Sequence, residues 1–410
     1  MKKNITKKAI CVILIIASLL SIIGCDNKEK EKELVISNNI QQDVKNKENK
    51  EFKVEKLSEL NITAESITPL FWKDDENIIG IDYIITTSTQ QSSNYNIYSI
   101  NIKTSTVTII DTLSNVSRQP QAFESNGYKI LYGKGNMLYT YNFQDKTNSQ
   151  LYDISQIESV IPLRCGIVEG SDKYLFINSR SAQQEKVEDT IRILDLETKK
   201  ILVTIPLNQL VCSDTIKYSK TNDIFYLNLM SSIGVSSTYI YEFKLNNPND
   251  IKKIDKLTNY NLTSITDDGK ELILSKGNIG TETPIRSIAK YDLTNDKLVD
   301  LLSIKASDNT LGGYFNVYLK KNCNFISYME TEGEGYSTKL STFIGSYENN
   351  KISNIQKLQT EPIDKFIIGD CKLLFNKKCN MLLYKVGYFD SIKQSRDGAI
   401  FKYYIYKLIN

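Results

Sequence analysis

Histidine is absent from all 410 residues of the chain, and tryptophan occurs only once, as Trp72. The lack of histidine excludes Ser-His-Asp and Cys-His catalysis, histidine-based zinc sites and the usual general base near neutral pH. Proline is scarce, with seven residues, while 41% of the chain is apolar, which is enough for a large core. No residue can be nominated as catalytic, metal-binding or cofactor-binding. We therefore expect a protein that is not an enzyme and holds no cofactor.

Long apolar runs are also lacking, with one exception near the N-terminus. A cationic start with four lysines precedes the apolar segment from Ala9 to Ile23, an order that is typical of an export signal. This segment has about 15 residues, whereas a membrane-spanning helix needs roughly 20. It ends in Ile22-Ile23-Gly24-Cys25, which resembles the lipobox of bacterial lipoproteins, whose signal peptide is cut before a lipidated cysteine.

The lipobox resemblance implies a signal peptide over residues 1–24 and a mature chain that begins with the lipidated Cys25. It implies an extracytoplasmic protein, lipid-anchored to the outer side of the cytoplasmic membrane. An uncleaved anchor and a signal cut elsewhere are the alternatives. Residues 25–51 are polar and mixed in charge apart from a short apolar stretch, and we expect a flexible tether there.

The charge of the chain gives no sign of a nucleic-acid partner. The formal charge of +3 includes the four signal lysines, so their removal leaves the mature chain at −1. A nearly neutral chain offers no general attraction to nucleic acid or anionic lipid.

Five cysteines remain after the signal and Cys25, an odd number with no metal-type spacing. They are Cys165, Cys212, Cys323, Cys371 and Cys379. Cys371 and Cys379 are placed to meet across a hairpin, and an exported protein permits a disulfide. Buried free thiols are the alternative that we favour.

From residue 52 onward, β-branched and aromatic residues alternate with polar ones in the period-two pattern of strands. A short apolar strand that ends in a polar residue and a turn recurs seven times, and so does a tight polar turn followed by an apolar strand. The strands are Ile97–Ile102, Leu138–Phe143, Ile191–Leu196, Tyr239–Phe243, Ile288–Leu293, Ser341–Gly345 and Tyr403–Tyr406. The repeat of about 51 residues is close to the length of a propeller blade.

These repeats predict an all-β fold, a seven-bladed β-propeller of four-stranded antiparallel blades over residues 52–410. The last unit offers only three strands, around residues 366–368, 381–384 and 401–405. The segment Phe52–Leu57 is similar to the fourth strands of other units, so we expect this N-terminal strand to complete the last blade and close the ring.

The turns at residues 125–130 and 266–272 are similar to the turn of the TolB-like propeller repeats, which contains serine or proline, aspartate and glycine. WD40 and kelch signatures are missing, and the single tryptophan argues against the tryptophan-docking repeats of quinoproteins. The TolB-like resemblance implies a partner in an envelope protein complex.

One face of the predicted propeller carries long connections between the second and third strands. They span residues 86–95, 178–190, 230–238, 275–287, 329–339 and 387–399. Since long loops concentrate where binding occurs, we expect this face to be the recognition surface. It contains the acidic cluster Glu330, Glu332 and Glu334, which we expect to be solvated rather than to bind Ca²⁺.

The predicted function is binding of a protein, peptide or envelope polymer on the long-loop face, without chemistry. The alternative is a carboxylate- or tyrosine-dependent hydrolase or lyase that acts on glycans or peptides at the central opening. A two-lobed solute-binding protein would need alternating helices and strands, and the chain shows no sustained helical period.

Overall fold

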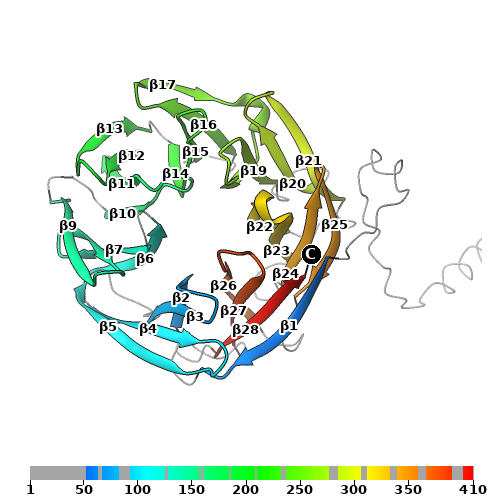
Figure 1. Cartoon of the computed structure of the whole chain (residues 1–410). Coiled ribbons are helices and arrows are strands. Elements are labelled where there is room, and N and C mark those ends of the chain that lie inside the picture. Colours follow the sequence, from blue (N-terminus) through cyan, green and yellow to red (C-terminus); the bar gives the residue numbers. More distant parts are fainter. Residues whose placement is uncertain are drawn as a thin grey trace, which may run out of the picture. The chain divides into compact units, whose positions relative to one another are not determined.

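The computed structural model describes most of the chain between residues 52 and 409. The described residues are 52–62, 67–82, 93–124, 128–155, 157, 161–183, 186–207, 210–231, 237–276, 285–305, 312–332, 339–358, 366–389 and 400–409. Within them, 28 strands form seven four-stranded antiparallel sheets arranged as a ring (Figure 1). The predicted seven-bladed β-propeller is confirmed.

We number the blades along the chain, and in each blade the strands follow one another outward from the centre of the ring (Figure 1). Blade 1 is β2 (Ile67–Trp72), β3 (Asn77–Asp82), β4 (Ser93–Asn101) and β5 (Val107–Val116); blade 2 is β6 (Arg118–Glu124), β7 (Tyr128–Lys134), β8 (Met137–Asn142) and β9 (Thr147–Asp153); blade 3 is β10 (Ile161–Ile167), β11 (Tyr174–Gln183), β12 (Lys186–Asp195) and β13 (Ile201–Pro206); blade 4 is β14 (Leu210–Ser219), β15 (Ile224–Ser231), β16 (Thr238–Lys244) and β17 (Asn247–Lys253).

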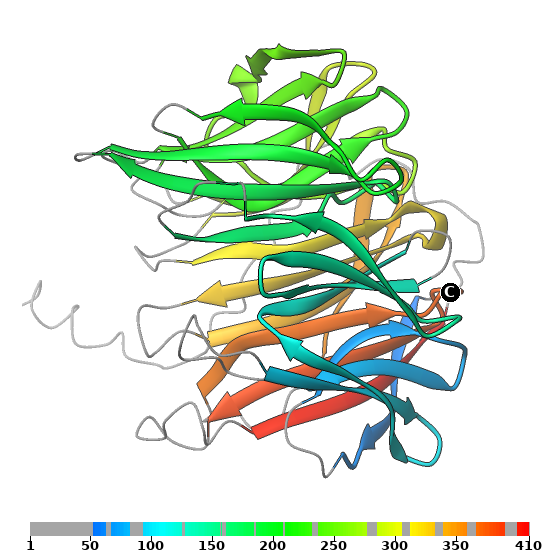
Figure 2. The same ribbon diagram turned by 90° about the vertical axis from the view of Figure 1, so that its left-hand side faces the viewer.

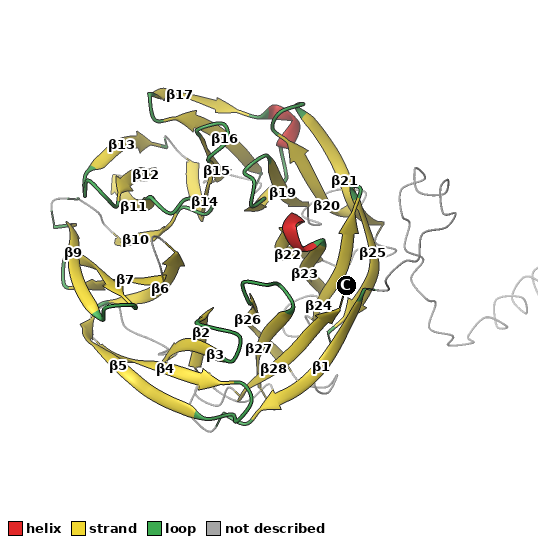
Figure 3. Cartoon of the chain, in the orientation of Figure 1, coloured by secondary structure: helices red, strands yellow, loops and turns green. Residues whose placement is uncertain are grey.

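The remaining three blades complete the ring. Blade 5 is β18 (Asn261–Ile265), β19 (Glu271–Lys276), β20 (Ile285–Asp292) and β21 (Lys297–Lys305); blade 6 is β22 (Gly312–Lys320), β23 (Phe325–Glu332), β24 (Lys339–Glu348) and β25 (Lys351–Lys357); blade 7 is β26 (Phe366–Phe375), β27 (Met381–Phe389), β28 (Ile400–Ile409) and β1 (Lys53–Leu60). Helix is limited in the described residues to the 3-10 turns η2 (Asp255–Leu257) and η3 (Lys321–Cys323), drawn red in Figure 3. No helix in the described ranges is long and apolar enough to cross a membrane.

Blade 7 is closed by the N-terminal strand. Strand β1 pairs antiparallel with β28, from Lys53 opposite Ile409 to Leu60 opposite Tyr403. Gln356 in blade 6 also accepts a hydrogen bond from the Val54 amide at 3.0 Å. Because β1 covers an otherwise unpaired strand edge, it stabilises the ring, and the predicted closure is confirmed.

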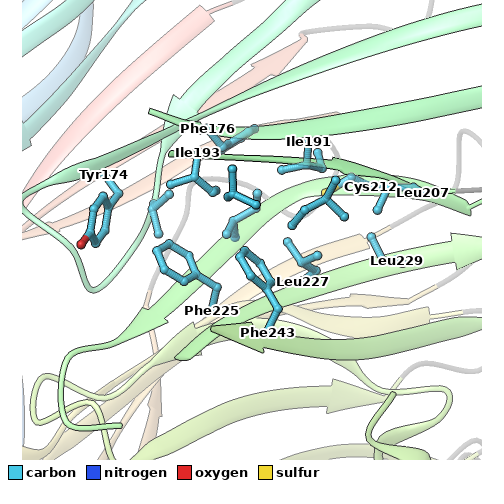
Figure 4. Close-up of a cluster of buried hydrophobic side chains, with 14 residues drawn as sticks. Tyr174, Phe176, Ile191, Ile193, Leu207, Cys212, Phe225, Leu227, Leu229 and Phe243 are labelled. Atoms are coloured by element: carbon cyan, nitrogen blue, oxygen red, sulfur yellow. The ribbon is translucent and has the colours of Figure 1, made fainter. Parts of the chain in front are cut away.

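The core lies between neighbouring blades. Period-two alternation turns one set of side chains of each blade toward the preceding blade and the other set toward the next. Between blades 3 and 4, Phe176 and Ile193 pack with Phe225 and Phe243, whose ring centroids are 5.0 Å apart (Figure 4). Burial of each phenylalanine contributes roughly 1.5–3 kcal/mol.

The two ends of the strands form two different faces, seen edge-on in Figure 2. We call one the turn face, because it carries the connections between first and second and between third and fourth strands. We call the other the crossover face, because it carries the second-to-third connections and the passages from blade to blade. On the turn face, ion pairs join neighbouring blades: Lys220 to Asp172 at 3.2 Å, Lys320 to Asp267 at 2.8 Å, and Lys378 to Asp75.

One predicted long connection is absent. Between Asn178 and Thr190 the chain does not form a long loop, because β11 and β12 continue to pair as far as Gln183 opposite Lys186. The sequence there is rich in polar residues and was therefore expected to be a loop. Backbone hydrogen bonds between strands do not depend on apolar side chains, so the hairpin continues beyond the apolar part of the blade.

The disulfide differs from the one considered from the sequence. Cys379 pairs with Cys323 and not with Cys371, and the two Cα atoms are 6.0 Å apart. Cys323 lies in the turn between β22 and β23, and Cys379 in the turn between β26 and β27. These turns belong to adjacent blades, so cysteines 56 residues apart in sequence meet. The favoured expectation of buried free thiols is therefore wrong for Cys323 and Cys379; of the cysteines outside the disulfide, Cys212 is buried and Cys165 is half-buried.

Candidate functional site

A cavity of about 440 Å³ lies between blades 2 and 3. It is formed by strands β6 to β8 on one side and by β10 and β11 on the other. Its described lining residues are Arg118, Gln119, Gln121, Leu131, Tyr132, Gly133, Leu138, Arg164, Cys165, Gly166, Ile167 and Phe176. Its volume falls in the usual range of small-ligand sites, so we treat it as the candidate binding site and call it the arginine pocket.

The arginine pocket reaches the crossover face at Arg118 and extends between the blades as far as Ile167, the last residue of β10. Arg118 at the start of β6 pairs with Gly133 near the end of β7, where the chain turns toward β8. Only Gly135 and Asn136 separate β7 from β8, and only two residues separate β11 from β12. In the other five blades, six to ten residues separate the second and third strands. The pocket therefore lies between the two blades that have the shortest of these connections.

Two glycines shape the wall of the pocket. A Cβ atom at Gly133 would lie 2.7 Å from Cδ of Arg118, and one at Gly166 would lie 2.5 Å from Cε1 of the Phe176 ring. Both distances are too short for real contacts. The missing side chains therefore leave room for the Arg118 side chain over Gly133 and let the ring of Phe176 form part of the pocket wall.

The polar groups of the pocket are cationic or neutral. Arg118 is half-buried and Arg164 is exposed, and they come from the innermost strands of neighbouring blades. Gln119 and Gln121 add neutral amides, and none of the twelve described lining residues is acidic. Both arginines already take part in interactions within the protein, so the pocket offers polar and apolar lining but selects no particular ligand charge.

The thiol in the pocket is not a nucleophile at neutral pH. Burial raises the pKa of Cys165 to about 11, although the nearby charge of Arg118 acts in the opposite direction. The carbonyl oxygen of Cys165 accepts a hydrogen bond from Nε2 of Gln121 at 3.1 Å. Since the thiolate is the reactive form, this cysteine contributes to packing and not to covalent chemistry near neutral pH.

We expect Cys165 to react with iodoacetamide at pH 8 about 100-fold more slowly than the same residue in the unfolded chain, because its pKa is higher by about two units. The rate at this residue should continue to rise up to a pH of about 11. Mass spectrometry of the peptide that contains Cys165 measures the rate, with the chain in guanidinium as control. A rate that levels off near pH 9 would contradict the raised pKa of Cys165.

The other residues singled out in the sequence are not among the described lining residues of the arginine pocket. Cys25 and the tether lie outside the described residues, as does most of each predicted long connection except that at residues 178–190, which belongs largely to β11 and β12. Glu330 is not solvated as expected, because its carboxylate lies 3.3 Å from the guanidinium of Arg286, a side chain that is 3% exposed. The described residues contain no group of three or more acidic, cysteine or histidine side chains arranged to hold a metal ion.

Sequence reasoning did not identify the arginine pocket. The only signal was the scarcity of arginine, since two of the six arginines of the chain are Arg118 and Arg164 and both stand in otherwise strand-like segments. The scarcity of arginine does not indicate that the two residues are close in space, because 46 positions separate them in the sequence. The propeller brings them together by placing β6 and β10 side by side around the channel (Figure 1).

No protein-family model matches the chain, and no curated protein matches it in sequence. Solved structures do resemble it. Oligogalacturonate lyase from Vibrio parahaemolyticus is 10% identical with a TM-score of 0.54, and the match covers 87% of this chain and 97% of that one. The propeller domain of the Trilobed protease from Pyrococcus furiosus is 11% identical with a TM-score of 0.49, over 84% and 94% of the two chains.

Acylaminoacyl peptidase from Pyrococcus horikoshii is 9% identical with a TM-score of 0.49, and the match covers 81% of this chain but 52% of the peptidase. The expectation that the chain is not an enzyme is corrected, because the lyase, which is an enzyme, resembles it in fold. The lack of histidine excludes only mechanisms that need histidine. At these identities the likeness shows the fold alone: the chain shares the β-propeller fold of proteins that include enzymes.

Proposed function

We propose that the chain is an extracytoplasmic, TolB-like propeller lipoprotein that binds a protein, peptide or envelope polymer through its crossover face. Cys25 would carry the lipid anchor on the outer side of the cytoplasmic membrane. The observation that carries the binding proposal is the arginine pocket, which combines a cavity of about 440 Å³ with two guanidinium groups from different blades.

Two features support the compartment and the family resemblance. The bond between Cys323 and Cys379 is of a kind that persists in oxidising compartments outside the cytoplasm. In the turn that resembles TolB-like repeats, Gly269 has a φ of +68° and Thr266 donates a hydrogen bond to Asp268 at 2.6 Å. Glycine adopts this backbone conformation readily, which fits a turn motif that ends in glycine.

The contrast between the two faces supports the choice of the binding surface. Neighbouring blades are joined across the turn face, where Ser219 donates a hydrogen bond to the Gly269 carbonyl oxygen and Thr221 donates one to the Asp268 carbonyl oxygen, both from blade 4 to blade 5. Glu169 of blade 3 also pairs with Lys217 of blade 4 and accepts from the Ile265 amide of blade 5 at 3.2 Å. These contacts hold neighbouring blades together, so the polar groups that make them on the turn face are already engaged within the protein.

A crosslinking pull-down from whole cells tests the proposal with the full lipoprotein and its Arg118→Gln/Arg164→Gln variant. We expect recovery of the partner to fall at least about 10-fold in the variant, because each charged hydrogen bond contributes about 1.5–3 kcal/mol. Glutamine keeps a polar side chain but removes the charge. The variant must retain the melting temperature of the wild type for the comparison to count.

The matched control is Lys103→Gln/Lys378→Gln, which removes two positive charges from the turn face. Both lysines are exposed, at 67% and 66%, so their ion pairs contribute little to stability. We expect this control to recover the partner as the wild type does. A partner that survives the arginine changes and is lost with the lysines would place binding on the turn face and refute the proposal.

A further inference from the structure

The charge of the turn face is unevenly distributed, although the chain as a whole is nearly neutral. The first turns of blades 1 and 5 contain the aspartate pairs Asp74-Asp75 and Asp267-Asp268. The equivalent turns of blades 6 and 7 contain lysine pairs instead, Lys320-Lys321 and Lys377-Lys378, each followed closely by a cysteine. One side of the turn face is therefore basic.

We call the lysines at the turn-face ends of blades 6 and 7 the basic rim. It consists of Lys53, Lys320, Lys321, Lys351, Lys377, Lys378 and Lys407. Among the described residues at these strand ends, the acidic side chains are Glu55 and Glu348. The bond between Cys323 and Cys379 joins the first turns of the two neighbouring blades, so it also keeps their lysines together (Figure 1).

Part of the basic rim is already paired within the protein, with aspartates of blades 5 and 1. The paired lysines are Lys320, Lys321 and Lys378. The other members, Lys53, Lys351, Lys377 and Lys407, are exposed, and none of them is in an ion pair within the described part of the chain. Even with Glu55 opposite Lys407 and Glu348 opposite Lys351 in the strand ladders, an excess of positive charge remains.

The chain enters the propeller at the basic rim. Lys53 lies opposite Ile409, the last residue of β28, which ends on the turn face. An anchor at Cys25 would therefore be joined to the propeller beside these lysines. As a flexible coil, residues 25–51 would span roughly 30 Å, which keeps this side of the propeller close to the membrane. In this respect the inference rests on the proposed function.

Anionic lipid headgroups suit these lysines chemically. The ammonium group of lysine is a compact charge that binds phosphate, and each lysine near an anionic membrane surface strengthens the attraction about 5-fold. A soluble acidic protein also attracts lysines. The entry of the chain at the basic rim favours the membrane, because an anchored chain holds the rim beside it.

We infer that the basic rim binds the anionic phospholipid headgroups of the membrane to which the chain is anchored. Lys53, Lys377 and Lys407 contact the phosphates from blade 7. The turn face of that blade then rests against the bilayer, and the crossover face is directed away from it.

Amine labelling of the full lipoprotein in vesicles tests the inference, with mass spectrometry of the peptide that contains Lys377 as the readout. The vesicles contain phosphatidylcholine alone or an equal mixture with phosphatidylglycerol. We expect Lys377 to be labelled at least about 5-fold more slowly on the anionic vesicles. Salt at about 1 M should abolish the difference, because it shortens the Debye length to about 3 Å. Lys200, an exposed lysine of the same face on blade 3, should be labelled equally on both.

Two double variants identify the charges that are responsible. Lys53→Gln/Lys407→Gln should restore most of the labelling of Lys377 on anionic vesicles, because it removes two contacts and leaves the reporter lysine in place. The matched control Lys270→Gln/Lys297→Gln removes two exposed lysines of blade 5 from the same face and should leave Lys377 protected.

Several outcomes would overturn the inference. Equal labelling of Lys377 on the two kinds of vesicle would do so, as would protection that survives the loss of Lys53 and Lys407. Protection of Lys200 equal to that of Lys377 would assign the contact to the whole face and not to the basic rim. Polyglutamate that protects Lys377 on neutral vesicles as strongly as the anionic lipid does would point to a soluble acidic partner.

Flotation of the chain with the same vesicles tests the anchor separately. A chain that floats with neutral vesicles but shows no protection of Lys377 refutes the inference and leaves the proposed anchor standing. A chain that floats only with anionic vesicles refutes the anchor and leaves the basic rim as the membrane contact. A chain that floats with neither refutes both.

Discussion

Replacing both Cys323 and Cys379 by serine is expected to lower the free energy of unfolding by about 4 kcal/mol, because the bond closes a long loop in the unfolded chain. The two cysteines are 56 positions apart and join the first turns of blades 6 and 7. The loss of loop-closure entropy on cross-linking a loop of this length gives the estimate. Denaturant titration of the wild type and the variant measures the difference.

A reductant provides the control for this prediction. Dithiothreitol should lower the stability of the wild type to that of the double serine variant and leave the variant unchanged. The two remaining described free thiols, Cys165 and Cys212, do not take part. Equal unfolding midpoints for the oxidised wild type and the variant would show that the bond does not constrain the unfolded chain.

Replacing Glu271 by alanine is expected to cost about 3–5 kcal/mol, because it leaves a buried ammonium group without its charged partner. Nζ of Lys290 lies 2.7 Å from Oε1 of Glu271, and the two side chains are only 5% and 8% exposed. Lys290 also donates to Oδ1 of Asn350 in blade 6 at 2.6 Å, so the buried charge joins blades 5 and 6. Denaturant unfolding of the variant measures the loss.

Two further variants show whether the lost charge pair is the cause. The double variant Glu271→Leu/Lys290→Met should recover much of the stability, because it removes both buried charges. Lys321, whose Nζ lies 2.9 Å from Oε2 of Glu271, loses that partner in both variants and keeps Asp268. Glu76→Gln breaks an exposed pair with Lys103, where the side chains are 48% and 67% exposed, and should cost no more than about 1 kcal/mol. A loss at Glu271 no larger than at Glu76 would refute the argument.

The fold could be predicted because each blade repeats the same local pattern. A polar turn followed by an apolar strand is visible in the sequence wherever a first turn occurs, as at Asp267-Asp268-Gly269. The partner of β1 was also predictable, because Phe52–Leu57 is similar to the fourth strands and the last unit lacked one. Both predictions need only the pattern of one unit at a time.

The arginine pocket and the disulfide could not be predicted in this way, because each depends on residues from two blades. Cys323 meets Cys379 only because equivalent turns of neighbouring blades lie side by side. The pocket exists because Gly133 and Gly166 have no side chains beside Arg118 and Phe176. The sequence of a single repeat shows neither of these contacts between blades. The long hairpin of β11 and β12 was not predicted, because its outer part is polar and lacks the apolar pattern of a strand although the backbone remains paired.

The closure by β1 also determines how the ring bears mechanical load. Tension on the chain before residue 52 reaches the propeller first at Lys53, which lies at the end of the β1–β28 ladder opposite Ile409. Force at the end of a ladder separates its pairs one after another, so β1 is the first strand to peel away. The bond between Cys323 and Cys379 does not involve β1, and it still joins blade 7 to blade 6 after β1 has left. A propeller pulled through its N-terminal segment would therefore lose strand β1, while the disulfide keeps blades 6 and 7 together.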